Sequence, residues 1–163
     1  MRILRRFLSV DDVSRLLRTC RLLERSGAFY RTDRGYAFAS ALNARVLAPL
    51  RDRARLVLPQ GVRYDSFFLR YETGVRAAAH VDPPGRIARL IALVREPDAG
   101  GDLVIAGQLA DLHEGDAVVF EPSKEEHEVT QVTGERIVWS VGSMRHSKRE
   151  RSIELRNDQG ASS

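Results

Sequence analysis

The chain has 163 residues, 43% of them hydrophobic and 29% charged, a balance typical of one globular domain with a single core. No apolar run approaches the ~18 residues of a membrane-spanning helix, and the stretch at residues 3–8 is too short and broken for a signal peptide. A lone cysteine, Cys20, excludes an internal disulfide, so the sequence predicts a cytoplasmic protein with no membrane partner.

The basic charge raises the question of a nucleic-acid partner. The formal net charge is +4 and the pI is about 9.7. Only two of the 26 basic residues are lysines, and the arginines are dispersed along the chain instead of forming one block. This pattern is more typical of coding bias than of a nucleic-acid surface, so the composition disfavours that partner.

The first third of the chain predicts helices and one hairpin. Ser9 with Asp12 predicts an N-cap, and apolar residues at helical spacing extend to a stop at Gly27. Two aromatic runs flank the turn residues Asp33-Arg34-Gly35, which predicts a hairpin over 28–39. Ser40 is interpreted as the cap of a second helix, which Pro49 kinks or ends.

From Val62 the pattern changes to short strands separated by glycine, proline or acidic turns. We expect strands over 64–71, 89–95, 103–105, 117–120, 127–132 and 136–141. Strands at this spacing favour a sandwich or barrel, here a double-stranded β-helix (jelly roll). The chain is therefore interpreted as one domain over 1–155, mainly β, with a helical buttress and hairpin at 1–61 and a jelly-roll core at 62–143. We expect an edge strand at 152–155 and a disordered tail at 156–163.

The segment His80-Val81-Asp82 carries the first chemical signal. Residues two apart share one face of an extended strand, so His80 and Asp82 can reach one point in space. A later histidine, His127, completes a set of two imidazoles and one carboxylate. This set is the facial triad of non-heme Fe(II) oxygenases, which leaves open positions on the metal. We predict that these three residues are metal ligands.

Further motifs surround this set at fixed spacing. Arg70-Tyr71-Glu72-Thr73-Gly74 precedes it, Gly100-Gly101-Asp102 follows it, and His127 begins a segment that leads to Arg136. In this order the sequence resembles the Fe(II)- and 2-oxoglutarate-dependent dioxygenases, most closely their prolyl 4-hydroxylase-like branch. The resemblance covers residues 67–142. It implies a hydroxylase that uses Fe(II), 2-oxoglutarate and O₂ and releases succinate and CO₂, with ascorbate as an optional reductant.

The resemblance also assigns the co-substrate contacts. An arginine inside a strand is costly unless it is paired, and a guanidinium suits a bidentate carboxylate. By the resemblance, Arg136 holds the distal carboxylate of 2-oxoglutarate, and Tyr71 donates a hydrogen bond to the same group. Two departures concern this pose: His127 and Arg136 are one residue closer than in many relatives, and Leu103 replaces a threonine often seen there.

The substrate itself is not identified by the sequence. Arg76, Arg86 in the Pro83-Pro84-Gly85-Arg86 segment, and Trp139 are candidate substrate contacts, and the hairpin at 28–39 is a candidate lid. The favoured substrate is a small molecule, an amino acid or a peptide. The sequence gives no prediction of oligomeric state.

Two other functions remain open at this stage. One is oxidative demethylation of alkylated nucleic acid, because alkylation-repair demethylases also resemble the Arg70–Gly74 motif with His80 and Asp82. Those enzymes carry a second arginine six residues after the cofactor arginine, where this chain has Gly142. The other is a non-catalytic jelly-roll module that binds metal without turnover.

Overall fold

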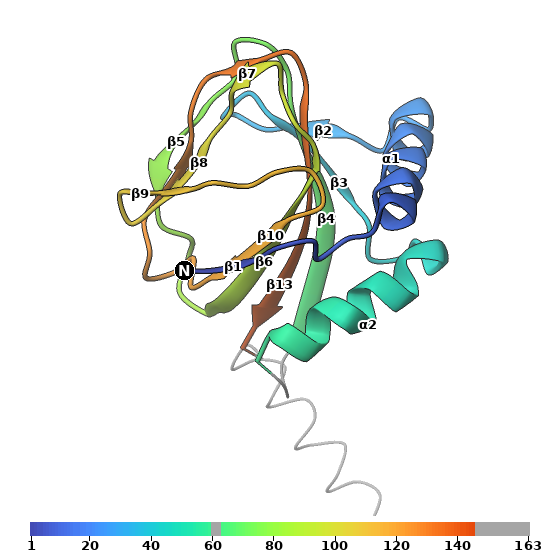
Figure 1. The fold of residues 1–163 in the computed structure, drawn as a ribbon, viewed down its shortest axis with the longest axis horizontal. Coiled ribbons are helices and arrows are strands. Elements are labelled where there is room, and N and C mark those ends of the chain that lie inside the picture. The colour runs from blue at the N-terminus through green and yellow to red at the C-terminus, as the bar shows by residue number, and fades with distance from the viewer. Residues whose placement is uncertain (60–62, 146–163) are drawn as a thin grey trace, which may run out of the picture.

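A computed structural model describes residues 1–59 and 63–145 (Figure 1). The edge strand predicted at 152–155 and the tail predicted at 156–163 lie outside the described residues. Within the described ranges, no helix is long and apolar enough to cross a membrane.

Two antiparallel sheets face each other and form the jelly roll predicted from the sequence (Figure 1). The larger sheet has the order β1-β10-β6-β13-β4-β3-β2, and its strands are β1 (Arg2–Leu4), β2 (Tyr30–Arg31), β3 (Ala37–Ser40), β4 (Arg63–Tyr71), β6 (Arg86–Arg95), β10 (Ala117–Phe120) and β13 (Arg136–Met144). The smaller sheet has the order β5-β11-β8-β9, and its strands are β5 (Ala77–His80), β8 (Leu103–Ile105), β9 (Gln108–Ala110) and β11 (His127–Val129). A two-stranded ribbon pairs β7 (Ala99–Gly100) with β12 (Val132–Thr133).

The helices lie against the outer face of the larger sheet (Figure 1). Helix α1 (Val10–Arg25) begins with the predicted capping box, in which Ser9 and Asp12 bond each other's backbone N–H groups. Its residues Leu16 and Cys20 are fully buried. Because these residues are four apart, they form the apolar stripe that packs on the sheet.

The second helix begins later than the sequence predicted. Ser40 lies in β3, opposite Phe67 of β4, so its backbone belongs to a strand and cannot cap a helix. A short 3₁₀ turn, η1 (Arg45–Leu47), leads into α2 (Ala48–Val57). Pro49 lies in the first turn of α2, where a missing N–H costs nothing, so it starts this helix instead of kinking or ending it.

The strand β13 separates two cores, because its side chains alternate between the faces of the larger sheet. Ile137 and Trp139 point toward the helices and belong to the core beneath α1 and α2. Val138 points the other way and belongs to the core between the two sheets. This alternation decides which side chains of β13 can reach the space between the sheets.

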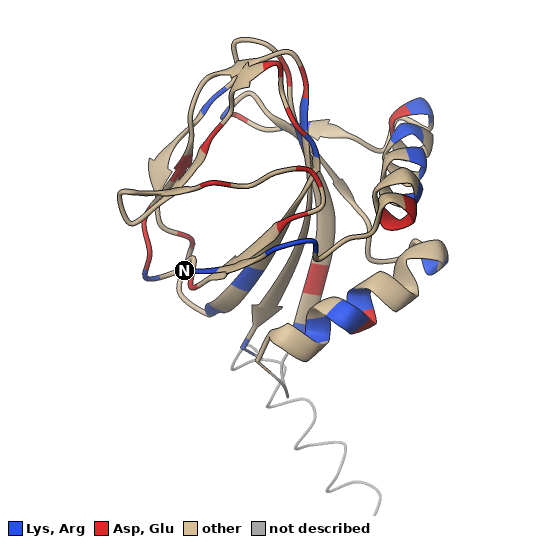
Figure 2. Cartoon of the chain, in the orientation of Figure 1, with Lys and Arg blue, Asp and Glu red and all other residues tan. Residues whose placement is uncertain are grey.

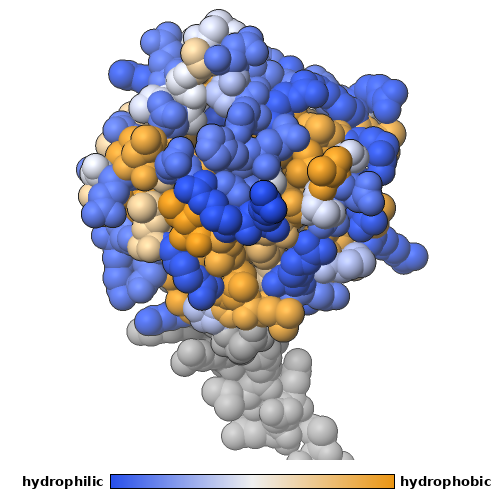
Figure 3. Space-filling view, in the orientation of Figure 1, coloured by the Kyte–Doolittle hydropathy of each residue, from blue (hydrophilic) through white to orange (hydrophobic). Residues whose placement is uncertain are grey.

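Charged and apolar residues are both distributed over the surface. Figure 2 shows basic residues on the helices and on several strands, with acidic residues among them. On the face shown in Figure 3, hydrophobic residues form patches separated by hydrophilic ones. The dispersed charge agrees with the distribution expected from the sequence.

Candidate metal and co-substrate site

The two histidines of the predicted triad lie opposite each other on adjacent strands. His80 ends β5 and His127 begins β11, and the two are paired in the register of the smaller sheet. Their ring centroids are 4.3 Å apart. Asp82 lies two residues beyond the end of β5, and its backbone N–H donates to the Pro122 carbonyl. That bond holds the backbone of Asp82 in place beyond the end of the strand.

One potential ligand atom from each of the three residues lies within 4.8 Å of the other two. The Nε2 atom of His80 is 3.8 Å from Oδ1 of Asp82. Metal ions bind nitrogen and oxygen ligands at about 2.0–2.2 Å, so small side-chain movements bring all three onto one ion. The structure thus brings together the three residues predicted as ligands.

Backbone carbonyls orient both imidazoles. His80 Nδ1 lies 2.8 Å from the Ala78 carbonyl, and His127 Nδ1 lies 3.1 Å from the Glu125 carbonyl. A carbonyl only accepts, so Nδ1 carries a proton in each of these contacts and Nε2 is the ring nitrogen left for a metal. Burial lowers the pKa of His127, which further favours the neutral imidazole that metals bind. The residues present therefore fit a divalent metal with nitrogen and oxygen ligands.

Arg136 lies in the same pocket, on the other sheet. It is only 3% exposed, and its guanidinium carbon lies 5.4 Å from the centroid of the Tyr71 ring. Among the described residues, no carboxylate lies within ion-pair distance of this guanidinium, and burial lowers its pKa. Asp102 attracts the guanidinium but forms no ion pair with it. A buried cation without a paired anion is unfavourable, so the geometry favours an anionic ligand at this position.

The Gly100-Gly101 motif makes room for Arg136. A side chain at Gly101 would approach Arg136 Cδ and Pro97 Cγ to 3.0 Å, closer than ordinary van der Waals contact. Gly101 also has a φ of +70°, which other residues rarely adopt. The motif singled out in the sequence therefore has a packing reason beside the arginine.

Tyr71 of β4 is the register partner of Arg136. Its side chain is buried, and burial raises its pKa to about 12 despite the opposing influence of Arg136. The phenol therefore stays protonated and keeps a hydrogen to donate. Arg136 and Tyr71 together offer a cation and a neutral donor, a combination that suits a carboxylate.

A pocket between the sheets contains both the triad and the Arg136–Tyr71 pair. Its remaining wall is largely apolar and includes Phe67, Leu69, Ile91, Leu103, Val129 and Val138. Leu103, which replaces the threonine often seen in relatives, thus faces the pocket as an apolar surface.

Comparisons with solved structures place this architecture among known folds. The chain aligns with a prolyl-4-hydroxylase from Pseudomonas putida at a TM-score of 0.71 and 23% identity, covering 89% of this chain and 92% of that one. A viral collagen prolyl hydroxylase from Paramecium bursaria Chlorella virus-1, solved with 2-oxoglutarate, aligns at 0.74 and 16% identity, covering 90% and 96%. A prolyl hydroxylase from Trichoplax adhaerens aligns at 0.73 and 16% identity, covering 93% and 86%.

The chain has the prolyl-4-hydroxylase fold. No protein-family model matches the sequence, and no curated protein matches it either. The similarity to these hydroxylases is therefore one of backbone fold, at sequence identities of 16–23%.

The three residues predicted as substrate contacts lie in three different environments of this fold. Arg86 lines the pocket and is the first residue of β6. Arg76 is exposed and does not line the pocket. Trp139 is fully buried in the core beneath the helices, and its indole N–H donates to Ser66 Oγ. The prediction of Trp139 as a substrate contact does not fit the structure, because Trp139 and Arg136 are three apart and face opposite sides of β13.

Arg89 is one of the pocket residues that the sequence analysis did not single out. Arg89 lines the pocket near Asp82 and is 5% exposed, yet only its position beside the apolar run Leu90–Val94 signals it in the sequence. Its ion-pair partner Asp65 lies on β4. Their proximity depends on strand register, which the sequence alone did not supply.

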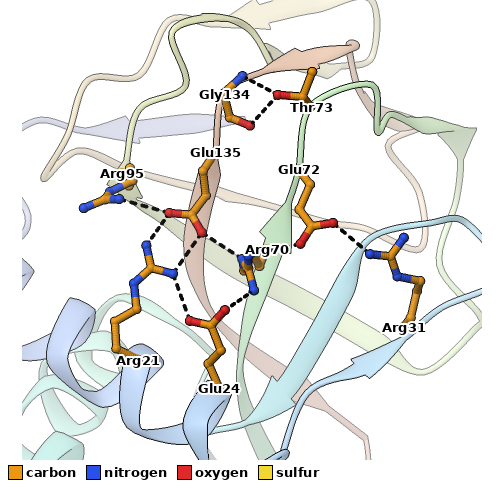
Figure 4. Close-up of polar contacts among 9 residues, drawn as sticks. All are labelled: Arg21, Glu24, Arg31, Arg70, Glu72, Thr73, Arg95, Gly134 and Glu135. Carbon is orange, nitrogen blue, oxygen red and sulfur yellow. Dashed lines mark hydrogen bonds and ion pairs between the residues drawn. The ribbon is translucent and has the colours of Figure 1, made fainter.

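On the outer face of this fold, an ion-pair network surrounds the strand ends that carry Tyr71 and Arg136 (Figure 4). Glu135 accepts hydrogen bonds from Arg21, Arg70 and Arg95. The network also links the β2–β3 hairpin, because Arg31 donates to Glu72 at 2.8 Å. It therefore joins α1, the hairpin, β4, β6 and the residue just before β13 behind the pocket.

Proposed function

We propose that this protein is a non-heme Fe(II)- and 2-oxoglutarate-dependent oxygenase that hydroxylates an unactivated C–H bond. The observation that carries the proposal is one pocket that holds a His-Asp-His cluster within 4.8 Å and a buried arginine with no carboxylate at ion-pair distance among the described residues. The first feature fits Fe(II), and the second fits the distal carboxylate of 2-oxoglutarate. The fold shared with prolyl hydroxylases supports the same assignment.

The residues have separate tasks in this proposal. His80, Asp82 and His127 hold the metal through Nε2, a carboxylate oxygen and Nε2. Arg136 and Tyr71 hold the far carboxylate of the co-substrate, and the apolar wall keeps water from the reacting centre. Fe(II) with 2-oxoglutarate and O₂ supplies the oxidising chemistry, and succinate and CO₂ are the co-products.

The substrate in this proposal is a small molecule, an amino acid or a peptide. The Trichoplax adhaerens neighbour was solved with a peptide fragment of hypoxia inducible factor, which makes proline-containing peptides the first class to screen. Arg86 at the pocket is the candidate contact on this chain. We place the activity in the cytoplasm and include ascorbate in the assay as a reductant.

The decisive test is an anaerobic titration of the metal-free protein with Fe(II) and 2-oxoglutarate. The expected result is the weak visible charge-transfer band of the chelate, followed by substrate-dependent succinate when O₂ is admitted. Folded, iron-loaded protein without the band would contradict the co-substrate assignment and leave a metal-binding jelly roll.

Removal of any ligand gives the largest expected effect on turnover. His80→Ala, Asp82→Ala and His127→Ala should each abolish substrate-dependent succinate formation, because two ligands cannot hold the ion in place at low metal concentration. The measurement is succinate release at saturating 2-oxoglutarate, with circular dichroism confirming the fold. Full turnover in any one variant would remove that residue from the ligand set.

A further inference from the structure

We propose that Arg89 is a positioning residue for the metal ligand Asp82, and that Gly142 exists to let Arg89 reach its place. The proposal rests on the proposed function in one respect: Asp82 must be a metal ligand. It assigns roles to Arg89, Asp65 and Gly142, which lie side by side on three adjacent strands of the larger sheet.

Arg89 is held by contacts on every side of its guanidinium. Its Nη1 donates to Ser140 Oγ at 2.8 Å, and its Nη2 lies 3.5 Å from Asp65 Oδ2. The guanidinium carbon also lies 4.8 Å from the centroid of the Phe67 ring. The side chain is 6% exposed, so its position is fixed by packing as well as by charge.

The remaining nitrogen of this guanidinium faces the metal ligand. Arg89 Nε lies 3.7 Å from Oδ2 of Asp82, while the other oxygen of Asp82 faces His80. One carboxylate oxygen is thus turned toward the histidines and the other toward a fixed cation. This division is what a monodentate carboxylate ligand requires, because its outer oxygen needs a partner of its own.

Arg86 contacts the same oxygen but is less firmly placed. Its Nε lies 3.5 Å from Asp82 Oδ2 and its Nη1 donates to Asp65, but its side chain is 31% exposed. Arg89, at 6%, is shielded from water and has less freedom to move. We therefore assign the orienting role to Arg89 and expect Arg86 to reinforce it.

Gly142 makes this geometry possible. It lies on β13 between Arg89 of β6 and Asp65 of β4, and it pairs with both. A Cβ at Gly142 would come within 2.5 Å of Asp65 Oδ1 and 3.0 Å of Arg89 Nη2. The arginine therefore reaches across the bare backbone to its aspartate, and a glycine inside a strand is typical of such a close approach.

Loss of Arg89 is expected to change the affinity for the metal. The direction of the change shows whether Arg89 acts mainly by orienting Asp82 or mainly by repelling the metal ion. The positive charge of Arg89 repels a bound cation, but the ion pairs with Asp65 and Asp82 partly neutralise that charge. If orientation of Asp82 dominates, loss of Arg89 weakens metal binding, by about 10- to 100-fold for a typical partner of a metal ligand. If repulsion dominates, loss of Arg89 tightens binding.

The experiment measures Co(II) binding to the full-length protein by visible absorption, without turnover. Arg89→Met keeps the length of the side chain and removes its charge, and Arg95→Met is the matched control on the same strand, outside the pocket. We expect Arg89→Met to raise the Kd for Co(II) by about 10- to 100-fold and Arg95→Met to leave it unchanged. An unchanged or lower Kd in Arg89→Met would overturn the proposal.

Two further variants separate positioning from general damage. Gly142→Ala should raise the Kd in the same direction as Arg89→Met, because the new methyl group displaces the guanidinium or its aspartate. In an Asp82→Asn background, Arg89→Met should have little further effect, because the residue through which it acts has lost its charge. Additive effects in this cycle would show that Arg89 acts on the fold and not through Asp82.

Co(II) binding by wild-type protein separates the proposed role of Arg89 from the proposed metal site on which it rests. Failure of wild-type protein to bind Co(II) would contradict the metal site itself. Normal Co(II) binding by wild-type protein, by Arg89→Met and by Gly142→Ala would contradict the role of Arg89 alone.

Discussion

Two arginines on adjacent strands, Arg70 of β4 and Arg136 of β13, have opposite electrostatic surroundings. Arg70 lies on the outer face of the larger sheet and forms ion pairs with Glu24, Glu72 and Glu135 (Figure 4). Arg136 lies on the inner face, is more deeply buried, and has no carboxylate partner among the described residues.

The difference shows where the fold serves stability and where it serves binding. A charge withdrawn from water is normally neutralised by the protein, as the outer face does for the partly buried Arg70. Leaving Arg136 without a partner costs stability, and the cost is recovered only when an anion enters the pocket. The unpaired arginine is thus the better guide to function, although the paired arginine has more contacts.

Replacing each arginine with methionine tests the difference between the two faces most directly. Arg136→Met should weaken 2-oxoglutarate binding by about 3 kcal/mol, roughly 100-fold, because one side of a buried charge pair is lost. The same change should leave the metal-free protein equally or more stable, because an unpaired buried cation is removed. Calorimetric titration of the Co(II)-loaded protein and thermal unfolding measure the two effects.

Arg70→Met is the matched control and should give the opposite result. We expect a lower unfolding midpoint and 2-oxoglutarate affinity within about twofold of wild type, because Arg70 does not line the pocket. Equal losses of 2-oxoglutarate affinity in Arg70→Met and Arg136→Met would contradict the assignment of binding to the inner face of the larger sheet alone.

A smaller effect is expected at the centre of the outer network. Glu135→Gln keeps the size of the side chain and removes the charge that three arginines share. We expect a loss of about 1–3 kcal/mol in the free energy of unfolding, since hydrogen bonds to charged groups contribute on this scale. Urea unfolding at neutral pH measures it, and an unchanged midpoint would show that the network contributes no net stability.

The smallest effect is a change in the pH dependence of stability. Burial alone would raise the pKa of Glu135, but the hydrogen bonds and charges of Arg21 and Arg70 outweigh it and lower the pKa below its ordinary value. A lowered pKa contributes stability above the unfolded value of about 4.3, and this contribution is lost as the pH falls through the folded value. The gap between wild type and Glu135→Gln should therefore narrow below about pH 4.3. A gap of constant size down to pH 3 would contradict the assigned shift.

The sequence predicted the fold well where the local signal was strong. The capping box of Ser9 and Asp12, the hairpin, and the strands at 103–105 and 117–120 agree with the structure. The predicted start of α2 was wrong, because Ser40 is both a good N-cap and an acceptable strand residue, and only its pairing with Phe67 decides between the two. The long strand expected at 127–132 is divided, since β11 and β12 pair with different partners.

Some residues of the candidate site were predictable from the sequence, and others were not. His80, Asp82 and His127 were found from spacing, and the structure brings their side chains together. Trp139 was predicted as a substrate contact, but strand periodicity already argues against that role. Because Arg136 faces inward, a residue three positions later faces outward. Arg89, Asp65 and Gly142 could not be found from sequence, because their association requires the register of β6, β13 and β4.

The pairing of β1 with β10 has a consequence for the order in which the chain can fold. Arg2 is the register partner of Val119, so the first strand has no partner in the larger sheet until most of the chain has been synthesised. Pairing over such a separation is slow, because the entropy of closing the loop must be overcome before the contact forms. Until β1 docks, the apolar strand β10 presents an unpaired edge, and this edge is where association between partly folded chains is expected to begin.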